Sequence, residues 1–259
     1  MLQTQQISWL RWYPVWSRNM HVWRKLIGPA LLGNIGEPLL YLLALGYGLG
    51  SFLGQKIEGL EYVVFLASGM VCASAMNTAS FEGMYSAYTR MAVQNTWVGM
   101  LTAPLTLRDI IIAEVIWCGT KSAISVTAIL VVASAMGLVA DARAILVLPL
   151  GWLVGVCFGS MALVMTSVAK NYDFFLYYFT LLVTPMLLLS GVFFPIDGMP
   201  AFVQTAAKIL PLYHALALMR PLMIGQMPTD VLLHLAVLGF YILVALPIAI
   251  RLISRRLLR

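Results

Sequence analysis

The chain has 259 residues, of which 61% are hydrophobic and only 10% are charged. Its 16 Lys and Arg outnumber 10 Asp and Glu, which gives a net charge of +6, and the mean hydropathy is +0.91. A water-soluble globule of this composition would have to expose large apolar patches. The composition therefore excludes a soluble protein and predicts an all-α integral membrane protein.

Residues 8–27 have the pattern of an amphipathic helix that lies at a membrane surface. Tryptophan prefers the headgroup level and basic residues attract anionic lipid, so we expect this helix to lie flat on the inner leaflet. Pro14 suits its first turn. A plain membrane anchor is the alternative. The apolar side consists of Trp9, Trp12, Tyr13, Trp16, Met20, Trp23 and Ile27, and the basic side of Arg11, Arg18 and Lys25.

Six apolar runs are long enough to cross the roughly 30 Å hydrocarbon core of a bilayer. No composition shift, low-complexity tract or internal repeat separates them, so residues 1–259 are predicted to form one transmembrane domain. A removable signal peptide is not expected, because no small-residue cleavage site follows the first run. The predicted spans cover residues 30–53, 62–84, 110–139, 144–169, 174–194 and 231–253.

The basic residues predict the orientation, because cytoplasmic loops retain Lys and Arg. Six spans place both termini on the same side. Eleven of the Lys and Arg fall on that side and four on the other, while Lys121 lies inside the third run. Both termini are therefore predicted to be cytoplasmic.

The longest cytoplasmic loop, residues 85–114, is predicted to contain a short helix over residues 89–101. Met91, Val98 and Leu101 are its apolar positions, and Pro104 ends it. A short amphipathic helix in such a loop suits the docking of a cytoplasmic partner.

Charged residues inside the predicted spans are costly and therefore informative. Glu37 lies in the first span, and Glu114 and Lys121 lie two turns apart on one face of the third. We expect Lys121 to have an acidic partner within the bundle, either Glu114 or Glu37. The pair is then either a structural clamp or a polar patch that the headgroup of a ligand contacts. Acidic residues within a membrane domain can also carry protons, so a proton-coupled transporter that uses Glu37, Glu82 or Glu114 is one candidate function.

Small residues in two spans repeat every fourth position, which permits close helix packing. They are Gly46, Gly50 and Gly54 in the first span and Gly151, Gly155 and Gly159 in the fourth. The fourth-span ladder is expected to pack within the chain. Cys72, Cys118 and Cys157 each lie alone in an apolar run, which indicates packing rather than a metal site or a disulfide. No paired nucleophile and base is present, so no enzymatic activity and no metal site are predicted.

The segment before the last span, residues 200–220, is predicted to form an external helical hairpin. Pro195 is expected to end the fifth helix, and Pro200 suits the first turn of a new one. Pro211 is expected to interrupt the pattern, leaving a second short helix over residues 214–220. An ordinary surface loop is the alternative. The residues singled out in this region are Phe194, Pro195, Asp197, Pro200, Phe202, Pro211 and Arg220.

Several stretches together resemble the membrane subunit of a type-2 ABC exporter. They are EPLLYLLALGYGLG, MLTAPLTLRDIIIAE and LSGVFFPIDGMPAFVQTAAKILPLYHALALMRP, and the similarity extends over almost the whole chain. Within that superfamily the sequence resembles the nodulation permeases that export lipochitooligosaccharide. The resemblance implies an elbow helix, six spans, a coupling helix after the second span and an external hairpin. It also implies a bacterial inner membrane location, a second permease copy and two copies of a separate ATPase.

The resemblance further suggests which residues contact the partner and the cargo. The chain has no Walker A sequence, so ATP and Mg are expected on the ATPase subunit and no cofactor is expected here. Nucleic acid is not an expected partner. The candidate coupling residues are Arg90, Met91, Trp97, Val98 and Leu101. An amphiphilic cargo favours aromatic surfaces, and the candidate groove residues are Tyr41, Tyr47, Phe174, Phe175, Tyr177 and Tyr178. Core packing is the alternative for each of these aromatic residues.

Overall fold

The computed structural model describes residues 10–53 and 56–257, with the side chains of positions 29–31, 34, 35, 37 and 53 left out. The described part is mostly helical and contains no strand, only an isolated bridge between Ile57 and Leu60. Its elements are α1 (Tyr13–Arg24), α2 (Ile27–Tyr41), η2 (Leu42–Leu49), α3 (Gly50–Leu53), α4 (Tyr62–Phe81), η3 (Glu82–Ser86), η4 (Thr89–Val93), α5 (Thr96–Met100), α6 (Leu107–Ala135), η5 (Ala142–Leu146), α7 (Val147–Val168), α8 (Phe174–Tyr178), η6 (Phe179–Val183), α9 (Thr184–Leu189), η7 (Ile196–Gly198), α10 (Ala201–Ala207), α11 (Pro211–Met223) and α12 (Val231–Leu257).

Four helices in the described residues are long and apolar enough to cross a membrane. They cover Tyr62–Val93, Leu107–Ala135, Ala142–Val168 and Val231–Leu257, and the bent pair α10–α11 would make a fifth if it counts as one span. The first of these continues from α4 through the π-helical segments η3 and η4. The membrane-embedded, all-helical character predicted from composition is therefore confirmed, while the arrangement in six spans stays a prediction.

The predicted first and fifth spans correspond to shorter apolar helices, Pro38–Phe52 and Phe174–Leu189. The fifth ends earlier than predicted. Its last helical residue is Leu189 rather than a residue next to Pro195, because Gly191 adopts a φ of +86°. That left-handed conformation ends a helix and is one that glycine adopts at little cost.

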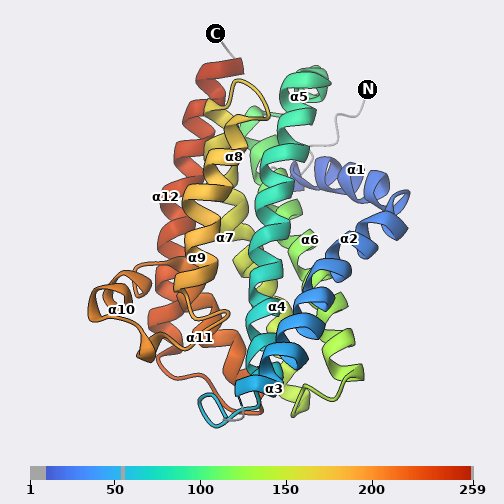
Figure 1. The fold of residues 1–259 in the computed structure, drawn as a ribbon. Coiled ribbons are helices and arrows are strands. Elements are labelled where there is room, and N and C mark those ends of the chain that lie inside the picture. Colours follow the sequence, from blue (N-terminus) through green and yellow to red (C-terminus); the bar gives the residue numbers. More distant parts are fainter. Residues whose placement is uncertain (1–9, 54–55, 258–259) are drawn as a thin grey trace.

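The core of the bundle is formed by α4, α6 and α7, with α12 packed along α7 (Figure 1). Most side chains of α4 are buried, whereas α12 exposes large apolar residues along its length. A helix that is apolar all round suits such a central position or contact with lipid. The flanking pieces are α2–η2–α3 on one side of α4 and α8–η6–α9 on the other.

Glycines bring α6 and α7 into close contact, as expected for the fourth-span ladder. A Cβ added at Gly155 would lie 2.5 Å from the Cβ of Ser122 and 2.8 Å from the Cα of Gly119. One added at Gly159 would lie 2.5 Å from the Cβ of Cys118. In the first-span ladder, Gly46 faces Val63 of α4 within the same chain, and Gly54 lies outside the described residues.

Replacing Gly155 by alanine is expected to destabilise the protein by about 1–3 kcal/mol, because α6 and α7 must separate to make room. The matched control is Gly239→Ala on α12, where an added Cβ meets nothing within 4 Å. The apparent melting temperature of the purified protein in detergent is the measurement. Equal melting temperatures for the two variants would contradict the contact described.

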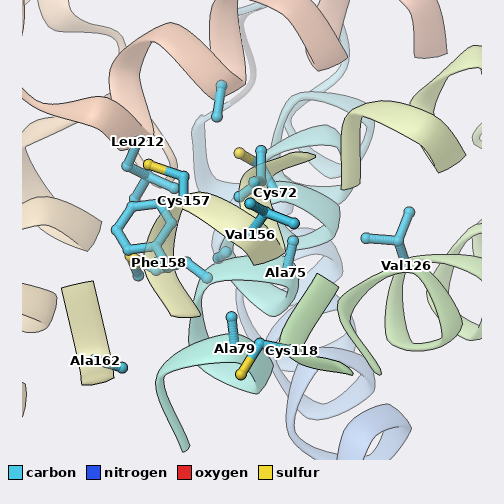
Figure 2. Close-up of a cluster of buried hydrophobic side chains, with 14 of the residues drawn as sticks. Cys72, Ala75, Ala79, Cys118, Val126, Val156, Cys157, Phe158, Ala162 and Leu212 are labelled. Carbon is cyan, nitrogen blue, oxygen red and sulfur yellow. The ribbon is translucent and has the colours of Figure 1, made fainter. Parts of the chain in front are cut away.

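The three cysteines are buried and free. Cys72 lies on α4, Cys118 on α6 and Cys157 on α7, among the apolar side chains of the core (Figure 2). Figure 2 also shows Phe158 and Leu212 beside Cys157. Their interpretation as packing residues is confirmed.

The predicted hairpin differs from expectation in its second helix. Pro211 opens α11 rather than interrupting a helix, and α11 continues past Pro221 to Met223. Its axis makes an angle of 84° with α10. Proline is tolerated in the first turn of a helix because that turn has no partner for its N–H. Since α11 packs against α4, α7 and α12, it dips back into the protein rather than lying on the surface.

Helix α1 lies across the direction of the bundle at the end that also holds α5 and the last turns of α12, and α10 lies at the opposite end (Figure 1). The indole nitrogen Nε1 of Trp16 donates to Thr120 Oγ1 at 3.0 Å, so α1 packs on α6. The buried positions of α1 are Val15 and Asn19, whereas Tyr13 is exposed. The buried side of α1 therefore differs from the predicted apolar side, because α1 packs against α6. Trp9, one of the predicted apolar residues, lies outside the described residues.

Candidate functional site

Four charged side chains form a closed cluster between α4–η3–η4 and α6. Arg90 Nη2 donates to Glu82 Oε1 at 2.8 Å and also to Glu114 Oε2, while Arg90 Nε donates to Glu114 Oε1 at 3.0 Å. Lys121 Nζ donates to Glu82 Oε2 at 2.7 Å. Glu82 and Glu114 are almost completely buried. Two cations neutralise two carboxylates, which is the condition under which buried charges are tolerated.

Two tryptophans complete the hydrogen bonding of these carboxylates. Trp117 Nε1 donates to Glu82 Oε1 at 2.9 Å, and Trp97 Nε1 donates to Glu114 Oε1 at 3.3 Å. Trp97 is fully buried although it belongs to the short helix α5. The segment after α4 is therefore tied directly to the charged cluster.

The cluster corrects the expected pairing of Lys121. Its partner is Glu82 rather than Glu114, because Glu114 is occupied by Arg90. Sequence reasoning placed Arg90 in a loop, since it ended the second span at residue 84, whereas the helix continues to Val93. The side chain of Glu37, the other expected partner, lies outside the described residues.

The predicted coupling helix over 89–101 is broken in two. Asn95 has a φ of +51°, which separates the π-helical end of the second span, η4, from α5. Asparagine is one of the few non-glycine residues that adopt this conformation readily. Of the candidate coupling residues, Arg90, Met91 and Trp97 point into the chain, Leu101 is half-buried, and Val98 is 48% exposed. Val98 is thus the most exposed of the five residues.

The predicted groove residues differ in their exposure. Tyr41, Tyr47 and Tyr177 are exposed, Phe174 is half-buried, and Phe175 and Tyr178 are buried in the core. Tyr177 and Tyr178 line an apolar cavity of about 440 Å³ between α7, α8–η6 and α12. Tyr177 and Tyr178, which are adjacent in the sequence, thus lie at this cavity, whereas Tyr41 and Tyr47 lie on the opposite flank of α4.

An aromatic surface on α4 was missed by sequence reasoning. Phe81 is half exposed, and its ring lies 4.4 Å from that of Phe179. Tyr85 stacks on Phe81 and on Tyr172, whose hydroxyl lies 2.7 Å from Thr89 Oγ1. Residues 81, 85, 88 and 89 recur at helical spacing, which indicates that the helix continues past residue 84. The second span was nevertheless predicted to end at that residue.

Arg220, in the last turn of α11, contacts residues of α4 and of the turn after α9. Its guanidinium lies 3.7 Å from the ring centroid of Phe65 and donates to Ser68 Oγ at 2.9 Å and to the carbonyl of Gly191 at 2.7 Å. Arg220 thus fixes α11 to α4 and to the left-handed turn after α9. The remaining candidates, Phe194, Pro195, Asp197, Pro200 and Phe202, are exposed or half-buried. Pro211, in contrast, is buried at the start of α11.

Two histidines that are 20 residues apart in the sequence are in contact. His214 Nδ1 lies 2.8 Å from His234 Nδ1, and His214 Nε2 lies 2.8 Å from the carbonyl of Lys208. This pair joins α11 to α12. In residues 10–53 and 56–257, no group of three or more His, Cys, Asp or Glu could hold a metal ion.

Comparison with known proteins identifies the family. Residues 12–224 match the family described as "ABC-2 type transporter". The chain belongs to the ABC-2 type transporter family. It is 44% identical over 250 residues to Nodulation protein J of Rhizobium leguminosarum bv. trifolii, covering 96% of this chain and 95% of that protein. It is 42% identical over 248 residues to Nodulation protein J of Bradyrhizobium diazoefficiens, covering 96% and 94%.

A more distant relative is the inner membrane transport permease YadH of Escherichia coli, 22% identical over 226 residues, with 82% of each chain covered. The chain is therefore an integral membrane subunit of a transporter, and its family implies an ABC ATPase as partner.

Proposed function

We propose that this ABC-2 permease exports an amphiphilic glycolipid, such as a lipooligosaccharide, from the cytoplasm or the inner leaflet. The observation that carries the proposal is the similarity, over nearly the whole chain, to several Nodulation protein J sequences at 39–44% identity. The apolar cavity and the exposed aromatic rings support an amphiphilic cargo, because such rings offer a rigid apolar face that also stacks on sugars.

The proposed assembly contains two permease chains and two ATPase subunits, with ATP and Mg bound by the ATPases. Each permease has six spans in a bacterial inner membrane and both termini in the cytoplasm. The arrangement of the ends supports this orientation. α1, α5 and the last turns of α12 lie at one end, and the α10 end is opposite. Arg255 and Arg256 lie in the last turn of α12, where the positive-inside rule favours the cytoplasm.

Motion is proposed to pass from the ATPase through α5 into the charged cluster. Val98 provides the exposed contact on α5, and Trp97 of the same helix binds Glu114 of α6. Arg90 connects Glu114 to Glu82, so a displacement of α5 acts on both α4 and α6. Such a link biases the permease between an inward-accessible and an outward-releasing state.

The cargo path is proposed to run along α4, between the flanks formed by η2 and η6. Tyr47 lies on one flank, and Phe179 lies on the other beside Phe81. The first-span glycines Gly46 and Gly50 face Val63 and Tyr62 of α4, so they hold the η2 flank against α4.

Transport in inside-out vesicles tests the function. Vesicles with the permease and its ATPase should accumulate radiolabelled lipochitooligosaccharide when ATP is supplied, and accumulation should stop with an ATPase that binds but does not hydrolyse ATP. A protonophore should leave uptake unchanged, because Glu82 and Glu114 are held in ion pairs. Uptake that needs the proton gradient and no ATP would favour a proton-coupled transporter instead. Uptake of another lipid or drug-like amphiphile, without the glycolipid, would retain the exporter and change its cargo.

A further inference from the structure

A polar cavity of about 280 Å³ lies between α1, the η3–η4 end of the second span and α6. It is separate from the apolar cavity of about 440 Å³ that lies between α7, α8–η6 and α12. Its walls combine charged side chains with apolar ones. The lining residues used below are Arg18, Asn19, Val22, Trp23, Leu26 and Lys121.

Two hydrogen-bond donors at this cavity lack a partner in the described part of the chain. They are Nδ2 of Asn19 and Nε1 of Trp23, and both atoms are buried. Asn19 as a whole is only 3% exposed. Buried polar atoms in proteins are nearly always paired, so unpaired donors on two residues that line one cavity indicate a missing acceptor. The indole of Trp23 is held in position by edge contact with Trp117.

Among the described residues that line this cavity, Arg18 is the cation with no acidic side chain within ion-pair distance. Arg90 and Lys121 are neutralised by Glu82 and Glu114, whereas the polar contact of Arg18 is with the amide oxygen Oδ1 of Asn19, at 3.2 Å. Burial lowers the pKa of Arg18, and the nearby Arg90 lowers it further, while Glu114 has the opposite effect. A positive charge that is desolvated and repelled by its neighbour is stabilised by an added anion.

The apolar residues at the cavity indicate which class of anion it binds. Val22 and Leu26 form an apolar side of the cavity on α1, the helix whose tryptophans suit the headgroup region of a bilayer. A ligand that matches all of these features has acceptor oxygens, one negative charge and an apolar body beside the headgroup. Basic pockets next to membrane helices bind the headgroups of anionic lipids in this manner.

We propose that this cavity binds the phosphodiester of an anionic phospholipid, with Arg18, Asn19 and Trp23 as its contacts. The lipid fills the space between α1 and the charged cluster. It therefore holds the amphipathic helix against η3–η4 and α6. Its assignment to the cytoplasmic leaflet rests on the orientation proposed above, whereas the binding itself does not depend on which cargo is exported.

Native mass spectrometry of the full-length chain in detergent, with added phosphatidylglycerol or phosphatidylcholine, tests the site. The wild type should retain one phosphatidylglycerol in preference to phosphatidylcholine. Arg18→Gln should weaken its retention by about 10-fold, the size expected for loss of one charge-assisted contact. Trp23→Phe, which removes the N–H and keeps most of the ring, should weaken it several-fold. The matched control Arg24→Gln changes the same charge on an exposed residue of α1, and it should have less than a twofold effect.

Three outcomes would overturn the proposal. Equal losses for Arg18→Gln and Arg24→Gln would show general attraction to a basic helix instead of a site. Equal retention of the two lipids would remove the role of the positive charge. Binding of inorganic phosphate that displaces the lipid would assign the site to a soluble anion. If Arg18→Gln does not give monodisperse protein, the retention of phosphatidylglycerol by Trp23→Phe and Asn19→Leu is compared with that of Arg24→Gln instead. Equal retention by these variants would then overturn the proposal. Retained lipid with no glycolipid export would leave this site standing and refute the proposed cargo.

Discussion

Replacing Arg90 by methionine should destabilise the protein by about 3–5 kcal/mol, because the change leaves a buried carboxylate without its cation. Glu114 is completely buried and would keep only the indole N–H of Trp97. Glu82 would still have Lys121 and Trp117. The measurement is the yield of monodisperse protein from membranes, together with its apparent melting temperature.

The control for Arg90→Met is Arg108→Met, which removes the same charge from an exposed position in the first turn of α6. The double variant Arg90→Met with Glu114→Gln should recover most of the lost stability, since no unpaired charge remains buried. A single Arg90→Met variant as stable as Arg108→Met, or a double variant as unstable as the single one, would contradict the assigned pairing.

Replacing Arg220 by methionine should release α11 from α4 and from the turn after α9. The variant loses the contact with the Phe65 ring, worth about 2 kcal/mol when desolvated. It also loses its bonds to Ser68 and to the carbonyl of Gly191, each bond from a charged donor contributing about 1.5–3 kcal/mol. We expect a lower apparent melting temperature and faster limited proteolysis between residues 195 and 210.

Arg143→Met is the matched control for Arg220→Met. Arg143 also donates to a glycine carbonyl, that of Gly225, at 3.0 Å, but its side chain is 50% exposed. Exposed contacts of this kind contribute only about 0–1 kcal/mol. If the two variants melted at the same temperature and were cleaved at the same rate, the role of Arg220 in holding α11 would be wrong.

The apolar runs and the proline pattern predicted the membrane-embedded helices and the bend near the last span. These features depend on local properties, the length of an apolar segment and the fixed φ of proline. The close approach of α7 to α6 was also predictable, because Gly151, Gly155 and Gly159 recur at the period of one helix face.

The pairing of individual side chains between helices was not predictable from such local properties. The second span was predicted to end at residue 84, which placed Arg90 in the short loop helix over residues 89–101, and so its pairing with Glu82 and Glu114 was missed. Nothing local reveals which acid on one helix faces which base on another. Pro221 was likewise expected to end a helix, whereas packing of α11 against α4 and α12 keeps it helical to Met223.

The balance of the charged cluster has an electrical consequence. Arg90 and Lys121 carry two positive charges and Glu82 and Glu114 carry two negative ones, so the group is neutral as a unit. A single elementary charge that crosses the whole membrane exchanges about 2.3 kcal/mol with a potential of 100 mV. If the four side chains shift together during a transport cycle, the net gating charge they contribute is zero. Their movement neither draws energy from the membrane voltage nor works against it, so this cluster adds no voltage dependence to the turnover rate.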